Sequence, residues 1–182
     1  MIAVTSGSRL WAMDGKELKR ALRELFEARV MNHGDYNLVC AQLFGPGPAL
    51  VLGYRRTPLE LVLCPVEVGR LPPTGGDGHR GLARLAAPIC SLDLTNVATV
   101  ADTGIAYQVQ TVTGFRTWFE VTGAPRITAG AAAAAGDGTV VLDQGEDAED
   151  FHQFMGHFMD ILDAFYQVPD TIESLGTLPA SA

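Results

Sequence analysis

Residues 146–167 read EDAEDFHQFMGHFMDILDAFYQ, and their pattern predicts one long amphipathic helix. Large apolar residues recur three or four positions apart, at Phe151, Phe154, Met155, Phe158, Leu162 and Phe165. Acidic residues fill the first turn, where they suit the positive end of the helix dipole, and Pro169 prevents the helix from continuing. Burying this stripe would contribute on the order of 10 kcal/mol of transfer free energy. We therefore expect the stripe to pack against a layer of strands.

A second amphipathic helix is predicted near the N-terminus, over about residues 14–31. Asp14 can cap this helix, and Glu17, three residues later, completes an acidic version of the capping box. Apolar residues then recur at helical spacing, at Leu18, Leu22, Leu25 and Phe26. The residues from Asn32 to Asp35 tolerate turn conformations and should end the helix.

The chain between the two helices, residues 36–121, has the composition of a strand-rich core. Its first part predicts a three-stranded meander, because three apolar runs are separated by turns that contain proline. These runs are residues 36–44, 49–55 and 59–68. The clearest hairpin is 107–121, where apolar and polar residues alternate on both sides of a Thr-Gly turn. Trp118 falls on the polar side of that alternation.

Three segments lack a pattern that could form a regular packed element. Residues 69–81 hold Pro-Pro and Gly-Gly pairs and are expected to form a long exposed loop. Residues 123–138 include a run of alanines between glycines that is too short for an isolated helix, so we interpret them as a flexible loop. Residues 170–182 are interpreted as a docked or frayed tail. A chain of 182 residues is close to the usual length of one domain, so we expect a single domain over 1–182.

The charge balance and the cysteines restrict the environment and the partners. The formal net charge is −8, which disfavours binding to nucleic acids and to anionic lipid surfaces. Cys40, Cys64 and Cys90 are isolated within apolar runs, so we interpret them as reduced core residues. No run of about 18 apolar residues predicts a membrane span. We expect a cytoplasmic protein, or one in a particle assembled in the cytoplasm.

The sequence carries no motif for catalysis, for a cofactor or for a metal. His152 and His157 are five residues apart on one predicted helix, which places them about 140° apart around its axis. His33 and His79 fall in predicted turns, and no glycine-serine-glycine elbow or phosphate-binding loop is present. We therefore expect no catalytic, cofactor-binding or metal-binding residue, and a non-enzymatic protein is favoured over an enzyme. A site assembled from residues distant in sequence would leave no such pattern.

Four residues are candidates for a surface that recognises a partner. They are Arg55, Arg56, Arg116 and Trp118. Arginine and tryptophan are over-represented at interaction hot spots. The alternative is that the arginines are solvated and that Trp118 packs under a neighbouring loop or helix.

Together these patterns predict an α+β fold. It has an N-terminal helix, a curved and mostly antiparallel sheet or small barrel of about 7–8 strands, and a long C-terminal amphipathic helix. This order loosely resembles pleckstrin-homology-type barrels, which end in such a helix. If residues 2–5 form a strand, it equally resembles the helix-grip folds that enclose a small ligand.

The leading functional hypothesis is a non-enzymatic protein–protein interaction subunit, or a structural subunit of a larger assembly, as a homo-oligomer or with other proteins. Two amphipathic helices and long loops beside a strand-rich core are a common means of holding neighbouring subunits. The first alternative is a helix-grip-type cavity protein or a cofactor-independent enzyme. The second is a lipid- or phosphopeptide-binding module of pleckstrin-homology type, which would use Arg55, Arg56 and Arg116.

Overall fold

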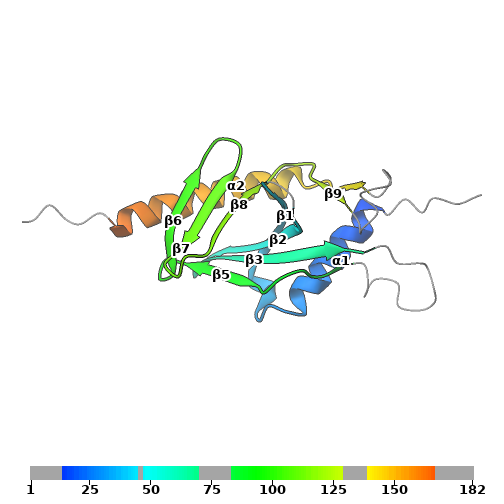
Figure 1. The fold of residues 1–182 in the computed structure, drawn as a ribbon, viewed down its shortest axis with the longest axis horizontal. Coiled ribbons are helices and arrows are strands. Elements are labelled where there is room, and N and C mark those ends of the chain that lie inside the picture. The colour runs from blue at the N-terminus through cyan, green and yellow to red at the C-terminus, as the bar shows by residue number, and fades with distance from the viewer. Residues whose placement is uncertain (1–13, 45–46, 70–82, 129–138, 167–182) are drawn as a thin grey trace, which may run out of the picture.

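The two predicted helices lie at the two ends of the described chain, with the predicted strands between them (Figure 1). The computed structural model describes residues 14–44, 47–69, 83–128 and 139–166. Its elements are α1 (Gly15–Glu27), the short 3-10 helix η1 (His33–Asp35), β1 (Asn37–Leu43), β2 (Ala49–Arg56), β3 (Leu59–Val68), β4 (Ala83–Leu85), β5 (Cys90–Asp93), β6 (Val97–Asp102), β7 (Tyr107–Thr111), β8 (Arg116–Glu120), β9 (Arg126–Thr128), β10 (Thr139–Val141) and α2 (Gly145–Tyr166). The tail predicted over 170–182 and most of the loop predicted over 69–81 lie outside the described residues.

The start of α1 is confirmed, and its end comes earlier than predicted. Asp14 is extended and its side chain accepts a hydrogen bond from the Lys16 N–H at 3.2 Å, as an N-cap should. The helix ends at Glu27 rather than near residue 31, and the chain then turns. Asn32 has a φ of 55°, a left-handed conformation that asparagine tolerates better than most residues. This turn brings the chain into β1.

The strands form one open antiparallel sheet rather than a closed barrel. Its order is β4-β3-β2-β1-β8-β7-β6, and β5 pairs with the same edge of β3 as β4 does. The predicted meander is β1-β2-β3, and the predicted hairpin is β7-β8. The two groups of strands are joined by only two residue pairs between β1 and β8, Gln42 with Glu120 and Leu43 with Phe119. The sheet therefore consists of two parts, β1–β5 and β6–β8.

The two faces of the sheet are covered differently. Helix α2 runs along one face of both parts (Figure 1), and its stripe is buried there from Phe151 to Leu162. Phe165, which the pattern placed in the same stripe, is 63% exposed. On the other face, α1 and the small β9-β10 hairpin cover β1, β2 and β3. Strands β2 and β3 are therefore apolar on both faces, which explains why their sequences are nearly continuous apolar runs rather than alternating ones.

Strand β9 corrects the interpretation of residues 123–138 as a loop. Residues Arg126–Thr128 pair with β10, and Ile127 and Val140 are buried in the core under α1. Only one apolar side chain of each strand faces inward, which is too short a pattern to recognise in a sequence. The remainder of that segment, residues 129–138, lies outside the described residues.

Candidate interaction surface

The part of the sheet formed by β6, β7 and β8 has one face that none of the other described elements covers, and we call it the open face. Side chains of a strand alternate between the two sides of a sheet, and here Tyr107, Val109 and Phe119 point toward α2. The neighbouring side chains point the other way and are exposed or half-buried. The open face consists of Thr99, Ala101, Gln108, Gln110, Arg116, Trp118 and Glu120.

Arg116 and Trp118 lie together on β8, at the side of the open face next to β1. The Arg116 guanidinium donates two hydrogen bonds to Gln110 Oε1, at 2.7 and 3.1 Å, and lies 5.6 Å from the centre of the Trp118 ring. These contacts hold the arginine against the indole ring. Trp118 remains 39% exposed, so the alternative in which it packs under a neighbouring element is wrong for the described residues. The structure thus brings two of the four predicted candidates into one surface.

Phe44 is a member of this surface that the sequence analysis did not identify. Its N–H donates to the Trp118 carbonyl at 3.0 Å, one step beyond the last registered pair of β1 and β8. Phe44 therefore lies opposite Trp118 across the two strands, and its side chain is 61% exposed. In the sequence Phe44 is the last residue of the apolar run 36–44, and nothing in that run distinguishes it from the residues that are buried.

Arg55 and Arg56 lie elsewhere and point to opposite faces of β2. Their neighbour Tyr54 pairs with Asn37 at the start of β1, whereas β8 pairs with residues at the end of β1. At about 3.3 Å per residue, this places them more than about 15 Å from Trp118. The four candidates do not form one patch.

Arg55 is neutralised on the α1 side of the sheet. Its guanidinium donates to Glu60 Oε2 at 2.5 and 2.9 Å and lies 4.6 Å from the centre of the Tyr36 ring. Glu60 loses hydration on burial, but hydrogen bonds from Ser91, Tyr36 and Arg55 more than offset that loss and lower its pKa. Burial and the Glu60 carboxylate raise the pKa of Tyr36 to about 12. This arginine is part of a structural network.

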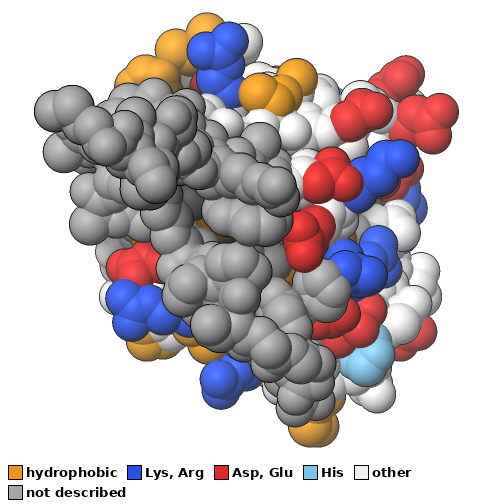
Figure 2. Space-filling view, turned by 90° about the vertical axis from the view of Figure 1, so that its right-hand side faces the viewer, with side chains coloured by type: hydrophobic (Ala, Val, Ile, Leu, Met, Phe, Trp, Pro, Cys, Tyr) orange, Lys and Arg blue, Asp and Glu red, His pale blue; other side chains and the backbone are white. Residues whose placement is uncertain are grey.

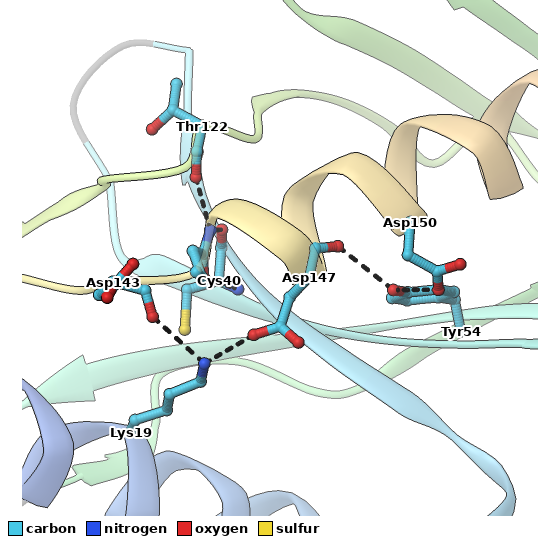
Figure 3. A network of polar contacts seen from close by, with 8 residues as sticks. Lys19, Cys40, Tyr54, Thr122, Asp143, Asp147 and Asp150 are labelled. Atoms are coloured by element: carbon cyan, nitrogen blue, oxygen red, sulfur yellow. Dashed lines mark hydrogen bonds and ion pairs between the residues drawn. The ribbon is translucent and has the colours of Figure 1, made fainter.

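Arg56 is neutralised on the α2 side. Its Nη2 lies 2.8 Å from Asp150 Oδ1, and the Tyr54 hydroxyl donates to the other carboxylate oxygen at 2.8 Å (Figure 3 shows the Tyr54 contact). The hydrogen bond from Arg56, together with those from Tyr54 and Asn37, lowers the pKa of Asp150. Acidic and basic side chains also lie next to one another on the described part of the molecular face near α1 (Figure 2).

We expect Asp150→Asn to lower stability at neutral pH by less than about 1 kcal/mol, because the ion pair with Arg56 is partly exposed and screened. The pKa of Asp150 is lower in the folded protein than in the unfolded chain. Its contribution to folding stability is therefore fully present at a pH above the unfolded-state pKa, and it is lost as the pH falls through the folded-state pKa. Urea unfolding of both proteins at several pH values would measure this. The difference between them should shrink in acid, and a constant difference would contradict the assignment.

Gln144 holds the junction between the two parts of the sheet. Strands β1 and β8 do not pair on the N-terminal side of Gln42, and there the buried Gln144 side chain bridges Cys40 and Thr122. Its amide accepts from the Cys40 N–H at 2.9 Å and donates to the carbonyls of Cys40 and Thr122, each at 2.8 Å. Near Cys40, Lys19 donates to the Asp143 carbonyl at 3.2 Å and to the Asp147 carboxylate at 2.6 Å, and so joins α1 to the start of α2 (Figure 3). Burial raises the pKa of the neighbouring Cys40 thiol to about 12.

One histidine lies against a hollow of about 420 Å³ at the start of β7. The Tyr107 hydroxyl and His152 Nδ1 are 2.7 Å apart, and burial followed by the charge of Asp102 raises the pKa of Tyr107 to about 12. A tyrosine with a raised pKa is a hydrogen-bond donor rather than a base near neutral pH. A second hollow, of about 710 Å³, lies between the ends of β1, β3 and β9 and is lined by Gln42, Glu67, Arg84 and Arg126 among others.

Within the described ranges, no group of three or more His, Cys, Asp or Glu side chains could hold a metal ion. His33 lies in η1, as expected for a turn, and His79 is outside the described residues. Cys40 and Cys64 are buried free thiols, and Cys90 is a half-buried one. None of the described helices combines the length and the apolar character needed to cross a membrane.

Comparison of the chain with models of protein families, with curated proteins and with solved structures finds no match.

Proposed function

We propose that the protein is a non-enzymatic interaction subunit that contacts its partner through the open face of β6–β8. The observation that carries the proposal is the side of these strands that no described element covers, where Arg116, Trp118 and Phe44 lie together. The equivalent side of β1–β3 is covered by α1 and the β9-β10 hairpin. A partner that covered Trp118 and Phe44 would bury two large aromatic side chains next to an arginine, the composition of an interaction hot spot.

The packing of α2 favours this proposal over a ligand cavity of the helix-grip type. Such a protein would hold its ligand between the helix and the sheet. Here that space holds aromatic rings in mutual contact: the centre of the Tyr54 ring lies 5.2 Å from that of Phe151 and 5.0 Å from that of Phe154, and the Phe154 and Phe158 rings are 5.8 Å apart. A ligand would have to displace them.

The arginines give little support to a lipid- or phosphopeptide-binding module. Arg55 and Arg56 already have carboxylate partners, Glu60 and Asp150, so a phosphate would have to compete with these ion pairs. Arg116, the third arginine of that alternative, lies on a different part of the sheet, and its guanidinium already donates two hydrogen bonds to Gln110. The net charge of −8 opposes an anionic ligand as well.

Trp118→Ala should abolish association and leave the fold intact. Because Trp118 is partly exposed on a polar face, we expect its loss to change the free energy of unfolding by less than about 0.5 kcal/mol. Sedimentation and cross-linking of the tagged protein, in extracts of the cells that make it, should show the wild type in a larger complex and the variant as a monomer. Met31→Ala is the control, since Met31 is 85% exposed and lies beside α1.

Two results would contradict the proposal. One is a wild-type protein that sediments as a monomer and gives no cross-links in native extract. The other is a Trp118→Ala variant that associates as the wild type does.

A further inference from the structure

Strand β6 is the last strand of the sheet on the side away from α1, and its outer edge carries backbone groups that no other described strand pairs with. The Thr103 N–H donates to the Ala106 carbonyl at 3.0 Å, and hydrogen-bonded and non-bonded pairs alternate along an antiparallel ladder. Every second residue of β6 before Thr103, namely Ala101 and Thr99, therefore directs its backbone N–H and C=O groups toward β7. The backbone groups of Val100 and Asp102 point away from β7, toward the outer edge of the sheet. This edge can accept a further strand.

The edge lacks the features that usually prevent strand addition. Strand β6 reads VATVAD, with no lysine and no proline, and its only charged side chain is the last one, Asp102. A bulge between Val97 and Thr99 disturbs only the first residues. The part of the strand from Thr99 to Asp102 is regular and at least partly exposed.

Helix α2 extends beyond this edge (Figure 1). Phe165 and Tyr166 continue the apolar stripe of α2, three and four residues after the buried Leu162, yet they are 63% and 53% exposed. They are exposed because the sheet beneath the stripe has ended at β6. The overhang from Leu162 to Tyr166 is about 6 Å long at 1.5 Å per residue, and one added strand needs about 4.8 Å. The Tyr166 hydroxyl already donates to the Val97 carbonyl of this edge, at 3.2 Å.

The charges around the edge indicate what kind of strand would fit. Helix α2 has six acidic residues and no Lys or Arg. Asp147 and Asp150 pair with Lys19 and Arg56, whereas Asp160 and Asp163 are exposed near the overhang, and Asp102 ends β6. A second copy of this chain would bring the same acids together and carries the same net charge of −8. A segment with basic residues would be attracted.

We propose that β6 accepts, as an added strand, one extended segment of a partner protein in which apolar residues alternate with basic ones. Its apolar side chains would face Phe165, Tyr166 and Leu162, and its backbone would bond to Val100 and Asp102. The Lys and Arg side chains would point to the opposite face of the sheet, so the acidic residues around the edge and the net charge of −8 would attract them at longer range rather than through ion pairs. This surface is distinct from the open face and does not depend on the function proposed above.

The test uses a fluorescent peptide of alternating valine and lysine, two residues longer than β6, and the full-length protein. A control peptide has the same composition in Val-Val-Lys-Lys order, which keeps the charge and removes the alternation. Fluorescence anisotropy should show roughly tenfold tighter binding of the alternating peptide, weakened by added salt. Amide hydrogen exchange at Val100 and Asp102 should slow on binding, while that of β1 and β2 stays unchanged.

Protein variants separate this surface from the rest of the molecule. Phe165→Ala should weaken binding of the alternating peptide roughly tenfold, and the exposure of Phe165 means that the variant should still fold. The double variant Asp160→Asn, Asp163→Asn should lower the affinity and its salt dependence. Trp118→Ala and Met31→Ala should leave peptide binding unchanged, so that failure of the open-face proposal can be told from failure of this one.

Several results would overturn the proposal. Equal affinity for the two peptides, or no change in exchange at Val100 and Asp102, would exclude strand addition. If these amides are protected without peptide and the protection rises with protein concentration, a second copy occupies the edge. Protection that is independent of concentration would mean that another segment of this chain occupies it.

Discussion

Phe151→Ala is expected to lower the free energy of unfolding by about 3–5 kcal/mol, the usual cost of removing a phenylalanine ring from a core. Phe151 is 0% exposed, and its ring centre lies 5.2 Å from that of Tyr54, 5.8 Å from that of Tyr107 and 6.3 Å from that of Phe119. These rings belong to β2, β7 and β8, so Phe151 links both parts of the sheet to α2. The cavity cannot close without moving several strands. Urea denaturation followed by circular dichroism would measure the loss.

Phe165→Ala is the matched control for this prediction. It removes the same side chain from the same stripe of α2, but at a position that is 63% exposed. We expect a change of less than about 0.5 kcal/mol. Equal losses at the two positions would mean that α2 does not cover the sheet as described.

Gln144→Leu is expected to lower the free energy of unfolding by about 3 kcal/mol. The substitution leaves the Cys40 N–H and the carbonyls of Cys40 and Thr122 without their partner, and each unsatisfied buried group costs about 1–3 kcal/mol. Some of this cost would be recovered if water entered the junction between β1 and β8. Thermal and urea unfolding would measure the loss, and hydrogen exchange should show faster opening at Cys40.

Gln42→Leu controls for the loss of a glutamine amide. Gln42 lies on β1 and is half-buried, and its Nε2 donates one hydrogen bond, to the Arg126 carbonyl at 2.7 Å. A loss of no more than about 1 kcal/mol is expected there. If Gln144→Leu cost no more than Gln42→Leu, the junction would not depend on the buried amide.

A glycine on β2 shows how closely α1 packs against the sheet. A Cβ atom on Gly53 would lie 2.6 Å from Phe26 Cε2 and closer still to Cζ, and Phe26 is 0% exposed. Glycine is therefore required for α1 to approach the sheet. In the sequence this residue only interrupts an apolar run, and the contact that explains it comes from a helix about 30 residues earlier in the chain.

Much of the fold is predictable from local pattern. The apolar stripe of α2, the Asp14 cap of α1 and the alternation in β7 and β8 each depend on residues that are close in sequence, where helical and strand periodicities act directly. Hairpin connections then make the sheet antiparallel, since short turns allow no other pairing. Strand β9 was missed because three residues are too few to establish a period.

The surface of the protein was less predictable. The sequence alone placed Trp118 on a polar strand face and proposed four candidates, but it could not show that Arg55 and Arg56 would find Glu60 and Asp150. Nor could it identify Phe44 or Gln144, whose roles come from where β1 leaves β8. The periodicity of a helix or strand shows which of its sides is apolar. It does not show which other element packs on that side, or at which residue this packing ends.

The amino-acid sequence by itself determined the class of the fold and the inward side of α1, α2, β7 and β8, because burial of apolar side chains follows from their spacing along the chain. The tertiary structure alone decided that β1–β3 are covered on both faces and β6–β8 on one, that two arginines are neutralised, and that the end of α2 passes the last strand. These features depend on distances between residues far apart in sequence, which the packing of complete elements sets.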